Sequence, residues 1–184
     1  NSNDGAESTA TLELLTTANP VGGPGTAFVA GSAGDGASAF ADHGAAKIYE
    51  TGDLAGALPG DAVSAAMTPV IDGGDSPDLV MFPQNYEGRD VMSRLSVKLD
   101  RTVLTNSTDV AVDGDSVSVI TPIFGGAKLV TSTFTGEAPH LAAFRPKSFE
   151  PAGGAGGAGD VVAAPVPDLG ATGGASVTAV HVEE

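Results

Sequence analysis

The chain contains no cysteine among its 184 residues. That absence excludes thiol catalysis, disulfide bridges and metal centres held by cysteine sulfur, including Cys-ligated zinc and iron–sulfur clusters. Tryptophan is absent as well, and the other aromatic residues are limited to seven Phe and two Tyr. Because large side chains are few and the chain has 26 Gly and 12 Pro, part of its length is expected to lie outside the hydrophobic core.

Basic residues and long apolar runs are also scarce. Eight Lys and Arg stand against 23 Asp and Glu, which gives a formal charge of −15. Such a chain repels phosphate backbones and anionic membranes at long range, so nucleic acid is not expected as a partner. No apolar run approaches the roughly 20 residues that span a bilayer, so direct membrane insertion is not expected. The polar start NSNDGAES lacks signal-peptide character, and we expect a cytoplasmic protein.

Motifs for catalysis, metals and cofactors are likewise missing. The three histidines, His43, His140 and His181, are far apart, so no metal site is predicted. No GxSxG motif of a hydrolase is present. The run from Gly154 to Gly159 matches GxGxxG, but no apolar strand precedes it and no helix follows. The sequence therefore predicts no catalytic, cofactor-binding or metal-ligating residue.

What is present centres on residues 77–99. The apolar run Leu79–Phe82 predicts a buried strand, and an amphipathic helix is expected to follow through Leu99. The polar turn between them is expected at the carboxyl end of a strand, where open α/β sheets place ligands and partners. Its candidate crevice or interface residues are Gln84, Asn85, Tyr86, Gly88 and Arg89.

Each residue type in this turn has an expected task. Gly88 permits a tight backbone, and Glu87 or Asp90 is expected to complement the helix dipole and to cap the helix. Two interpretations of Arg89 stay open. Its guanidinium either holds an anion or a partner carboxylate, or it pairs with a local acid and only fixes the turn.

The remaining segments predict one α/β domain over residues 1–150. Helices are expected at 7–19, 37–43 and 62–71, with Pro20 and Gly22-Gly23 ending the first and Pro69 interrupting the third. Strands are expected at 26–31, at 47–51 on a sheet edge, and at 141–144, with an antiparallel β-meander over 103–134 that turns at Asp113-Gly114. The glycine-rich turn Gly31–Gly36 lies between a strand and a helix, so its amides could face an anion.

The C-terminal part has a different composition. Gly, Ala and Pro make up 18 of the 25 residues from 151 to 175, which predicts a flexible linker. Alternation returns at Val177–Val182, so residues 176–184 are expected to form a terminal strand.

Several segments, in this order, resemble one known family. They are LELLTTA (12–18), HGAAKIY (43–49), PDLVMFPQNYEGRDVMSRLSVKL (77–99), SVITPIFGGAKLVTS (118–132) and FRPKSFEP (144–151). Together they are similar to the N-terminal domain of the electron transfer flavoprotein alpha subunit, over roughly residues 8–151. The resemblance implies a three-layer α/β/α fold with a mostly parallel Rossmann-like sheet, of the adenine nucleotide alpha hydrolase-like kind, and the added antiparallel β-meander.

The resemblance also implies a role and its partners. Members of the family are heterodimers of alpha and beta subunits that carry electrons through one FAD from dehydrogenases, such as those of fatty acid oxidation, to a membrane quinone reductase. The family holds FAD mainly in the alpha C-terminal domain, which would begin after the predicted strand 176–184. FAD is therefore expected in the full-length heterodimer and not on this fragment, and AMP is expected, if anywhere, in the partner subunit. The family also has a strand before its first helix, which supports the expectation of a fragment.

Two hypotheses follow. The first is a structural and interaction domain of an electron transfer flavoprotein alpha subunit, which is no enzyme by itself. The alternative is a stand-alone adenine-nucleotide-binding module that would use the Gly31–Gly36 turn and the crevice at Asn85–Arg89.

Overall fold

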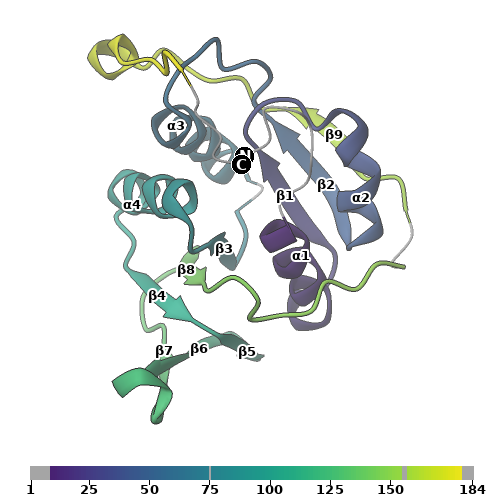
Figure 1. Ribbon diagram of the computed structural model, residues 1–184, viewed down its shortest axis with the longest axis vertical. Helices are drawn as coiled ribbons and strands as arrows, with labels where there is room; N and C mark the ends of the chain where they lie inside the picture. Colours follow the sequence, from purple (N-terminus) through teal and green to yellow (C-terminus); the bar gives the residue numbers. More distant parts are fainter. Residues whose placement is uncertain (1–8, 75, 155–156, 180–184) are drawn as a thin grey trace.

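Two parallel sheets form the middle layer of the molecule (Figure 1). The computed structural model describes residues 9–74, 76–154 and 157–179. One sheet has the order β1 (Gly25–Val29), β2 (Ala45–Glu50), β9 (Asp160–Ala163). The other has the order β3 (Leu79–Pro83), β8 (His140–Phe144), β4 (Val103–Ser107). The predicted α/β class with a mostly parallel sheet is confirmed.

The four α-helices of the described residues begin and end as follows: α1 (Thr9–Gly22), α2 (Ala37–Asp42), α3 (Pro59–Asp72) and α4 (Tyr86–Leu99). Helix α1 continues past Pro20 and ends at Gly22, one of the residues predicted to end it, whereas the predicted interruption of α3 at Pro69 was wrong. Each proline removes one hydrogen bond of its helix, but it lies in the last turn, so only two or three helical residues follow it. Short 3₁₀ turns complete the set: η1 (Gly34–Gly36), η2 (Phe124–Gly126) and η3 (Gly170–Gly174).

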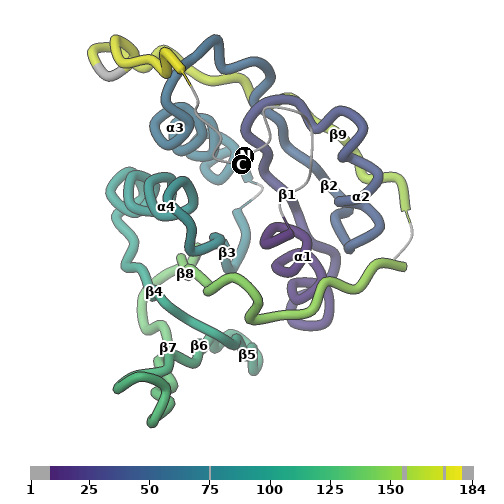
Figure 2. The backbone as a smooth tube through the Cα atoms, in the orientation of Figure 1, coloured from purple at the N-terminus to yellow at the C-terminus, as the bar shows by residue number. Residues whose placement is uncertain are grey.

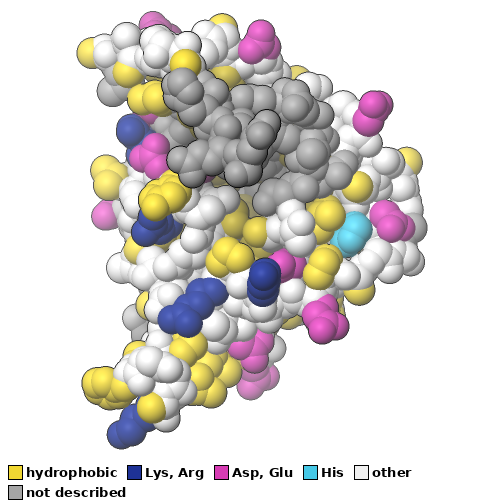
Figure 3. Space-filling view, in the orientation of Figure 1, with side chains coloured by type: hydrophobic (Ala, Val, Ile, Leu, Met, Phe, Trp, Pro, Cys, Tyr) yellow, Lys and Arg dark blue, Asp and Glu magenta, His cyan; other side chains and the backbone are white. Residues whose placement is uncertain are grey.

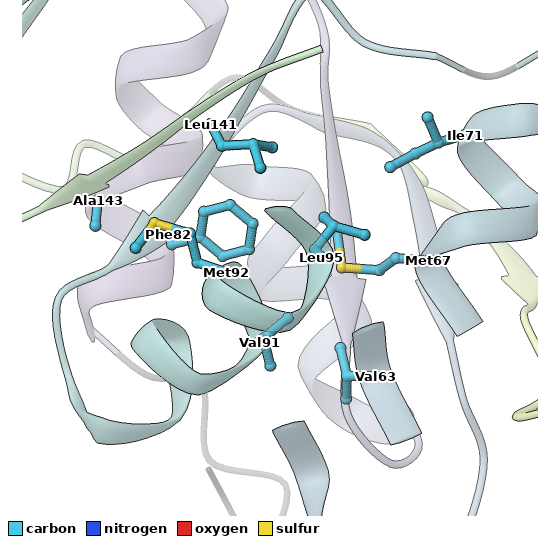
Figure 4. Close-up of a cluster of buried hydrophobic side chains, with 9 residues drawn as sticks. All are labelled: Val63, Met67, Ile71, Phe82, Val91, Met92, Leu95, Leu141 and Ala143. Atoms are coloured by element: carbon cyan, nitrogen blue, oxygen red, sulfur yellow. The ribbon is translucent and has the colours of Figure 1, made fainter. Parts of the chain in front are cut away.

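Strand β8 separates two cores because its side chains alternate between the faces of the sheet. Leu141 and Ala143 point to the cluster that α3 and α4 build (Figure 4), whereas Ala142 and Phe144 belong to a cluster with α1 and the strands β5 and β6. All four side chains are at most 1% exposed. Helices thus cover both faces of this sheet, which is the layering expected from the sequence.

Helix α1 links the two parallel sheets. Leu14 packs in the cluster behind β8, and the adjacent Leu15 packs with Ala27 and Ile48 of the β1–β2 sheet and with Phe40 of α2. Within the described residues no ladder joins β1 to β3, so shared side-chain packing connects the sheets. No helix in the described part of the chain combines the length and apolar character that crossing a bilayer requires.

The segment predicted as a flexible linker contains strand β9. Residues 160–163 pair in parallel with Lys47–Glu50 of β2, so the prediction that residues 47–51 lie on a sheet edge was wrong. After β8 the chain runs past α1 before it reaches β9 (Figure 2), and Ala152 N donates to Thr16 Oγ1 on the way, at 3.1 Å. Composition could not predict this strand, because its ladder needs a partner far away in the sequence. The boundaries of the three predicted domains stay a prediction.

The predicted β-meander is confirmed as an antiparallel sheet of β5 (Asp109–Asp113), β6 (Ser116–Ile123) and β7 (Lys128–Thr133). Its first turn lies at 114–115, one residue later than the predicted turn. The predicted strand at 176–184 falls partly outside the described residues. Its described part, 176–179, forms only an isolated bridge from Ser176 to Ala57.

Candidate functional site

Polar side chains gather where the parallel strands β3, β8 and β4 end. The turn after β3 supplies the predicted residues, strand β4 supplies Asn106, and the loop after β8 supplies two cations. We call this surface the polar edge. Its residues are Gln84, Asn85, Tyr86, Gly88, Arg89, Asn106, Arg145 and Lys147. Carboxyl ends of neighbouring parallel strands meet at one edge of a sheet, which is why three distant segments converge here.

Asn85 and Gly88 fix the start of helix α4. Asn85 is the N-cap residue, and its Oδ1 accepts a hydrogen bond from Gly88 N at 2.7 Å. The prediction that Glu87 or Asp90 caps the helix was therefore wrong, although Glu87 does lie in the first turn, where its charge complements the helix dipole. A Cβ at Gly88 would overlap the carbonyl oxygen of Pro83. Glycine is required here because the helix starts directly against the end of β3.

Tyr86 and Arg89 form an exposed pair on the first turn of α4. The Tyr86 side chain is 86% exposed, and the Arg89 guanidinium carbon lies 5.1 Å from the centre of its ring. Among the described residues no ion pair joins Arg89 to an acid, and its neighbour Asp90 pairs with Arg94 at 2.9 Å. The sequence left two interpretations of Arg89 open. The structure contradicts the one in which Arg89 pairs with a local acid.

A chain of hydrogen bonds ties Gln84 to the two other strand ends. Gln84 N donates to Phe144 O at 2.8 Å, and Gln84 Oε1 accepts from Asn106 N. Asn106 Oδ1 in turn accepts from Arg145 Nε at 2.6 Å. The ends of β3, β4 and β8 are thus joined by side chains beyond their backbone ladders.

Asn106 takes its place through a local irregularity of β4. The register between β4 and β8 shifts between Leu104 and Ser107, and Asn106 has φ 64°. Asparagine tolerates this left-handed conformation better than most residues, and a bulge of this kind redirects a side chain. The bulge turns the Asn106 amide towards Arg145.

A buried acid of helix α1 holds the loop after β8 in place. Glu13 of α1 is 5% exposed, and its Oε2 accepts from Lys147 N at 2.9 Å. The side chains of Arg145 and Lys147 remain exposed. Sequence reasoning did not select Asn106, Arg145 or Lys147 as site residues. The one signal was that two of the eight basic residues of the chain stand two positions apart in FRPK.

The other predicted anion site, the turn Gly31–Gly36, already has internal partners. Glu50 Oε2 accepts from Ala33 N at 2.7 Å and from Ser32 Oγ at 3.2 Å, while Thr51 Oγ1 accepts from Gly31 N at 2.8 Å. A carboxylate of the chain thus occupies the position that a phosphate would need. These contacts disfavour a nucleotide at this turn.

The described part of the chain gives little support for a metal site or for catalysis by a histidine. Within it, no group of three or more His, Asp or Glu side chains could hold a metal ion. His43 Nδ1 bonds Ala39 O at 2.8 Å, and the His140 ring stacks on Phe134 with centroids 4.6 Å apart. His181 lies outside the described residues. The polar edge is suited to binding, through exposed cations and an exposed aromatic ring.

Comparison with known proteins agrees with the sequence resemblance. The family model of the electron transfer flavoprotein domain matches residues 1–169. A curated relative, the electron transfer flavoprotein subunit alpha of Syntrophomonas wolfei subsp. wolfei, is 31% identical over 160 residues, which is 86% of this chain. The chain spans half the length of that relative. The recognition made from the sequence, an alpha-subunit N-terminal domain, is confirmed, and the chain belongs to the electron transfer flavoprotein family.

Proposed function

We propose that this chain acts as the interaction domain of an electron transfer flavoprotein alpha subunit. It packs against the beta subunit and supports the flavin-carrying domain, and it performs no redox chemistry by itself. The complete heterodimer carries electrons from dehydrogenases to the quinone reductase of the respiratory chain. Its cytoplasmic location stays a prediction from the sequence. Family membership supports this role, and the described residues add a surface suited to protein contacts.

The observation that carries the proposal is the exposed Tyr86–Arg89 pair. Tyr and Arg are enriched at the energetic centres of protein interfaces, and a ring at 86% exposure contributes little to the stability of the fold that carries it. The pair stands on the rigid first turn of α4, which Asn85 caps. Pre-organisation of this kind lowers the entropy that binding costs. Contact with another subunit or domain accounts for the exposed ring more directly than a small ligand does.

Binding to the cognate beta subunit tests the role. The wild-type chain is expected to bind it, and the double change Tyr86→Ala with Arg89→Ala is expected to weaken binding at least about tenfold, as loss of interface anchors does. Val97→Ala is the matched control, because Val97 is 82% exposed on the same helix but lies near its other end. Isothermal titration calorimetry measures each affinity. A chain that does not bind the beta subunit would contradict the proposal.

The cofactor proposal has a separate test. FAD is proposed to bind the complete heterodimer and not these 184 residues, and AMP is proposed to bind the beta subunit if it binds at all. Titration of this chain alone with FAD is therefore expected to give no stoichiometric binding at micromolar concentration. Tight FAD binding would instead assign a flavin site to this domain. A thermal shift with AMP or ATP that Arg89→Ala abolishes would favour the stand-alone nucleotide-binding module.

A further inference from the structure

We propose that Arg145 is a pre-oriented anchor for a carboxylate on a protein partner, with Lys147 as a second cation beside it. The proposal rests on the proposed interaction role and names a part of that surface which the sequence prediction did not include. The partner segment would carry at least two Asp or Glu side chains. The guanidinium of Arg145 would hold one carboxylate through two parallel hydrogen bonds.

The first step of the argument is the orientation of the guanidinium. Arg145 Nε donates to Asn106 Oδ1 at 2.6 Å, and Asn106 itself is fixed through Gln84. This bond uses one of the five N–H donors of arginine. The terminal nitrogens Nη1 and Nη2 have no partner among the described residues, and Arg145 is an exposed residue. A guanidinium held through Nε presents the edge formed by Nη1 and Nη2, and the two N–H groups of this edge match the two oxygens of a carboxylate.

The second step is the charge around Arg145. In a chain with 23 acidic residues, Arg94 pairs with Asp61 and Asp90, and Arg101 pairs with Glu137. Arg145 pairs with no acid among the described residues, although acids outnumber basic residues almost threefold. Since an intramolecular acid does not neutralise this guanidinium, its charge is available to an external one.

The third step is the rigidity of the loop. Arg145 N donates to Ser107 O at 2.9 Å, Ser148 N donates to Arg145 O at 3.3 Å, and the buried Glu13 holds Lys147 N. Both exposed cations therefore stand on backbone that is bonded to neighbouring elements. Figure 3 shows dark-blue Lys and Arg groups over the loop that leaves β8, with magenta Asp and Glu groups beside them. Fixed charges on a fixed loop favour one orientation of a partner, which gives specificity.

The fourth step distinguishes a protein from a small anion. Sites for small molecules are concave and bury most of the ligand surface. Residues 145–147 are all exposed, and Tyr86 on the first turn of α4 is also exposed. An open surface with an arginine and a tyrosine is typical of a protein interface. The structure therefore favours a carboxylate that belongs to a protein over a free phosphate or nucleotide.

The experiment measures binding of the cognate beta subunit at several salt concentrations. Arg145→Ala is expected to raise Kd about ten- to hundredfold and to reduce its salt dependence, because a charge-assisted bidentate contact is lost. Asn106→Gly keeps the left-handed backbone and every charge but removes the orienting amide, and a smaller rise of about three- to tenfold is expected. Lys98→Ala, an exposed cation near the far end of α4, is the matched control and should leave Kd unchanged. Arg145→Lys keeps the charge without the fork and should fall between wild type and Arg145→Ala.

A second measurement does not depend on the beta subunit. The Nε–H signal of Arg145 is followed by nuclear magnetic resonance while a hexaglutamate peptide, inorganic phosphate or AMP is added to the wild-type chain. We expect the peptide to shift the signal at lower concentration than either phosphate compound. Arg145→Lys assigns the signal, and circular dichroism checks the fold of each variant.

The outcomes separate this inference from the proposed function. If the beta subunit binds wild type and Arg145→Ala equally, the anchor is wrong and the interaction role stands. If the beta subunit does not bind the wild-type chain, the interaction role is contradicted, and the peptide titration then decides the anchor. A peptide that shifts nothing overturns it. A stronger response to phosphate or AMP overturns it in favour of a small-anion site.

Discussion

Replacing Gly88 by alanine tests how helix α4 is seated on strand β3. The added methyl group would overlap the carbonyl oxygen of Pro83 and would lie 3.1 Å from both the Pro83 carbonyl carbon and Asn85 Oδ1. Optimal contacts between such atoms are about 3.5–4.0 Å, so the helix must move away from the strand or the backbone must distort. Either response also disturbs the cap that Asn85 makes with Gly88 N.

The expected net loss in the free energy of unfolding is about 1–3 kcal/mol. Overpacking against rigid backbone costs about 1–3 kcal/mol, and loss of an N-cap bond costs about 1 kcal/mol. The higher helix propensity of alanine offsets about 1 kcal/mol of this. Urea denaturation followed by circular dichroism measures the difference. Binding to the beta subunit should weaken as well, since Tyr86 and Arg89 move with the first turn.

Gly22→Ala is the matched control for this prediction. Gly22 is a helical glycine at the end of α1, and a Cβ there would have no atom within 4 Å. Its replacement should leave stability unchanged or raise it by up to about 1 kcal/mol. If Gly88→Ala were as stable as Gly22→Ala, the close approach of α4 to β3 would be refuted.

Three further substitutions test the fold by urea denaturation. Asn85→Ala should cost about 1 kcal/mol, because an N-cap acceptor is lost. Arg94→Met should cost about 1–3 kcal/mol, because Asp61, whose side chain is 9% exposed, loses its ion pair of 3.4 Å and is left buried. Gly159→Ala should cost about 1–3 kcal/mol, because a Cβ would lie 2.9 Å from Ile48 Cδ1 in the packed β2–β9 region.

Each of these three substitutions has a control variant that lacks the proposed cause of destabilisation. Asn85→Ser retains a capping oxygen and should stay within about 0.5 kcal/mol of wild type. Asp90→Asn removes only the exposed partner of Arg94 and should cost less than about 1 kcal/mol. Gly174→Ala adds a Cβ with no atom within 4 Å and should be neutral. Equal effects at Gly159 and Gly174 would indicate that residues 157–163 are not packed as the structure has them.

The local sequence pattern was enough to predict most elements of the α/β core. The apolar run Leu79–Phe82 and the helical spacing of Val91, Leu95 and Leu99 are properties of short segments, so the sequence predicted β3 and α4. The meander was predicted for the same reason, because Gly114 and Gly125-Gly126 mark its turns locally. The effect of Pro69 was predicted wrongly. A proline disrupts a helix to an extent that depends on its position in the helix, and the sequence did not show how far this helix continues.

The candidate site was predictable only in part. The turn after β3 was found because a polar segment between a strand and a helix is visible in sequence, and Gly88 was given its correct task. The cap was assigned to charged residues, whereas the amide of Asn85 has the geometry to accept from Gly88 N. Asn106 and Arg145 were not selected, because nothing local indicates that the two lie within hydrogen-bonding distance.

The sequence by itself determined the fold class, the family, the acidic character of the chain and the polar turn at Gln84–Arg89. Each of these depends on composition or on neighbours along the chain. The tertiary structure decided the order of the strands, the place of β9 beside β2 and the joining of Gln84, Asn106 and Arg145 at one edge. These features require segments that are distant in sequence to meet, and no local pattern encodes which of them do.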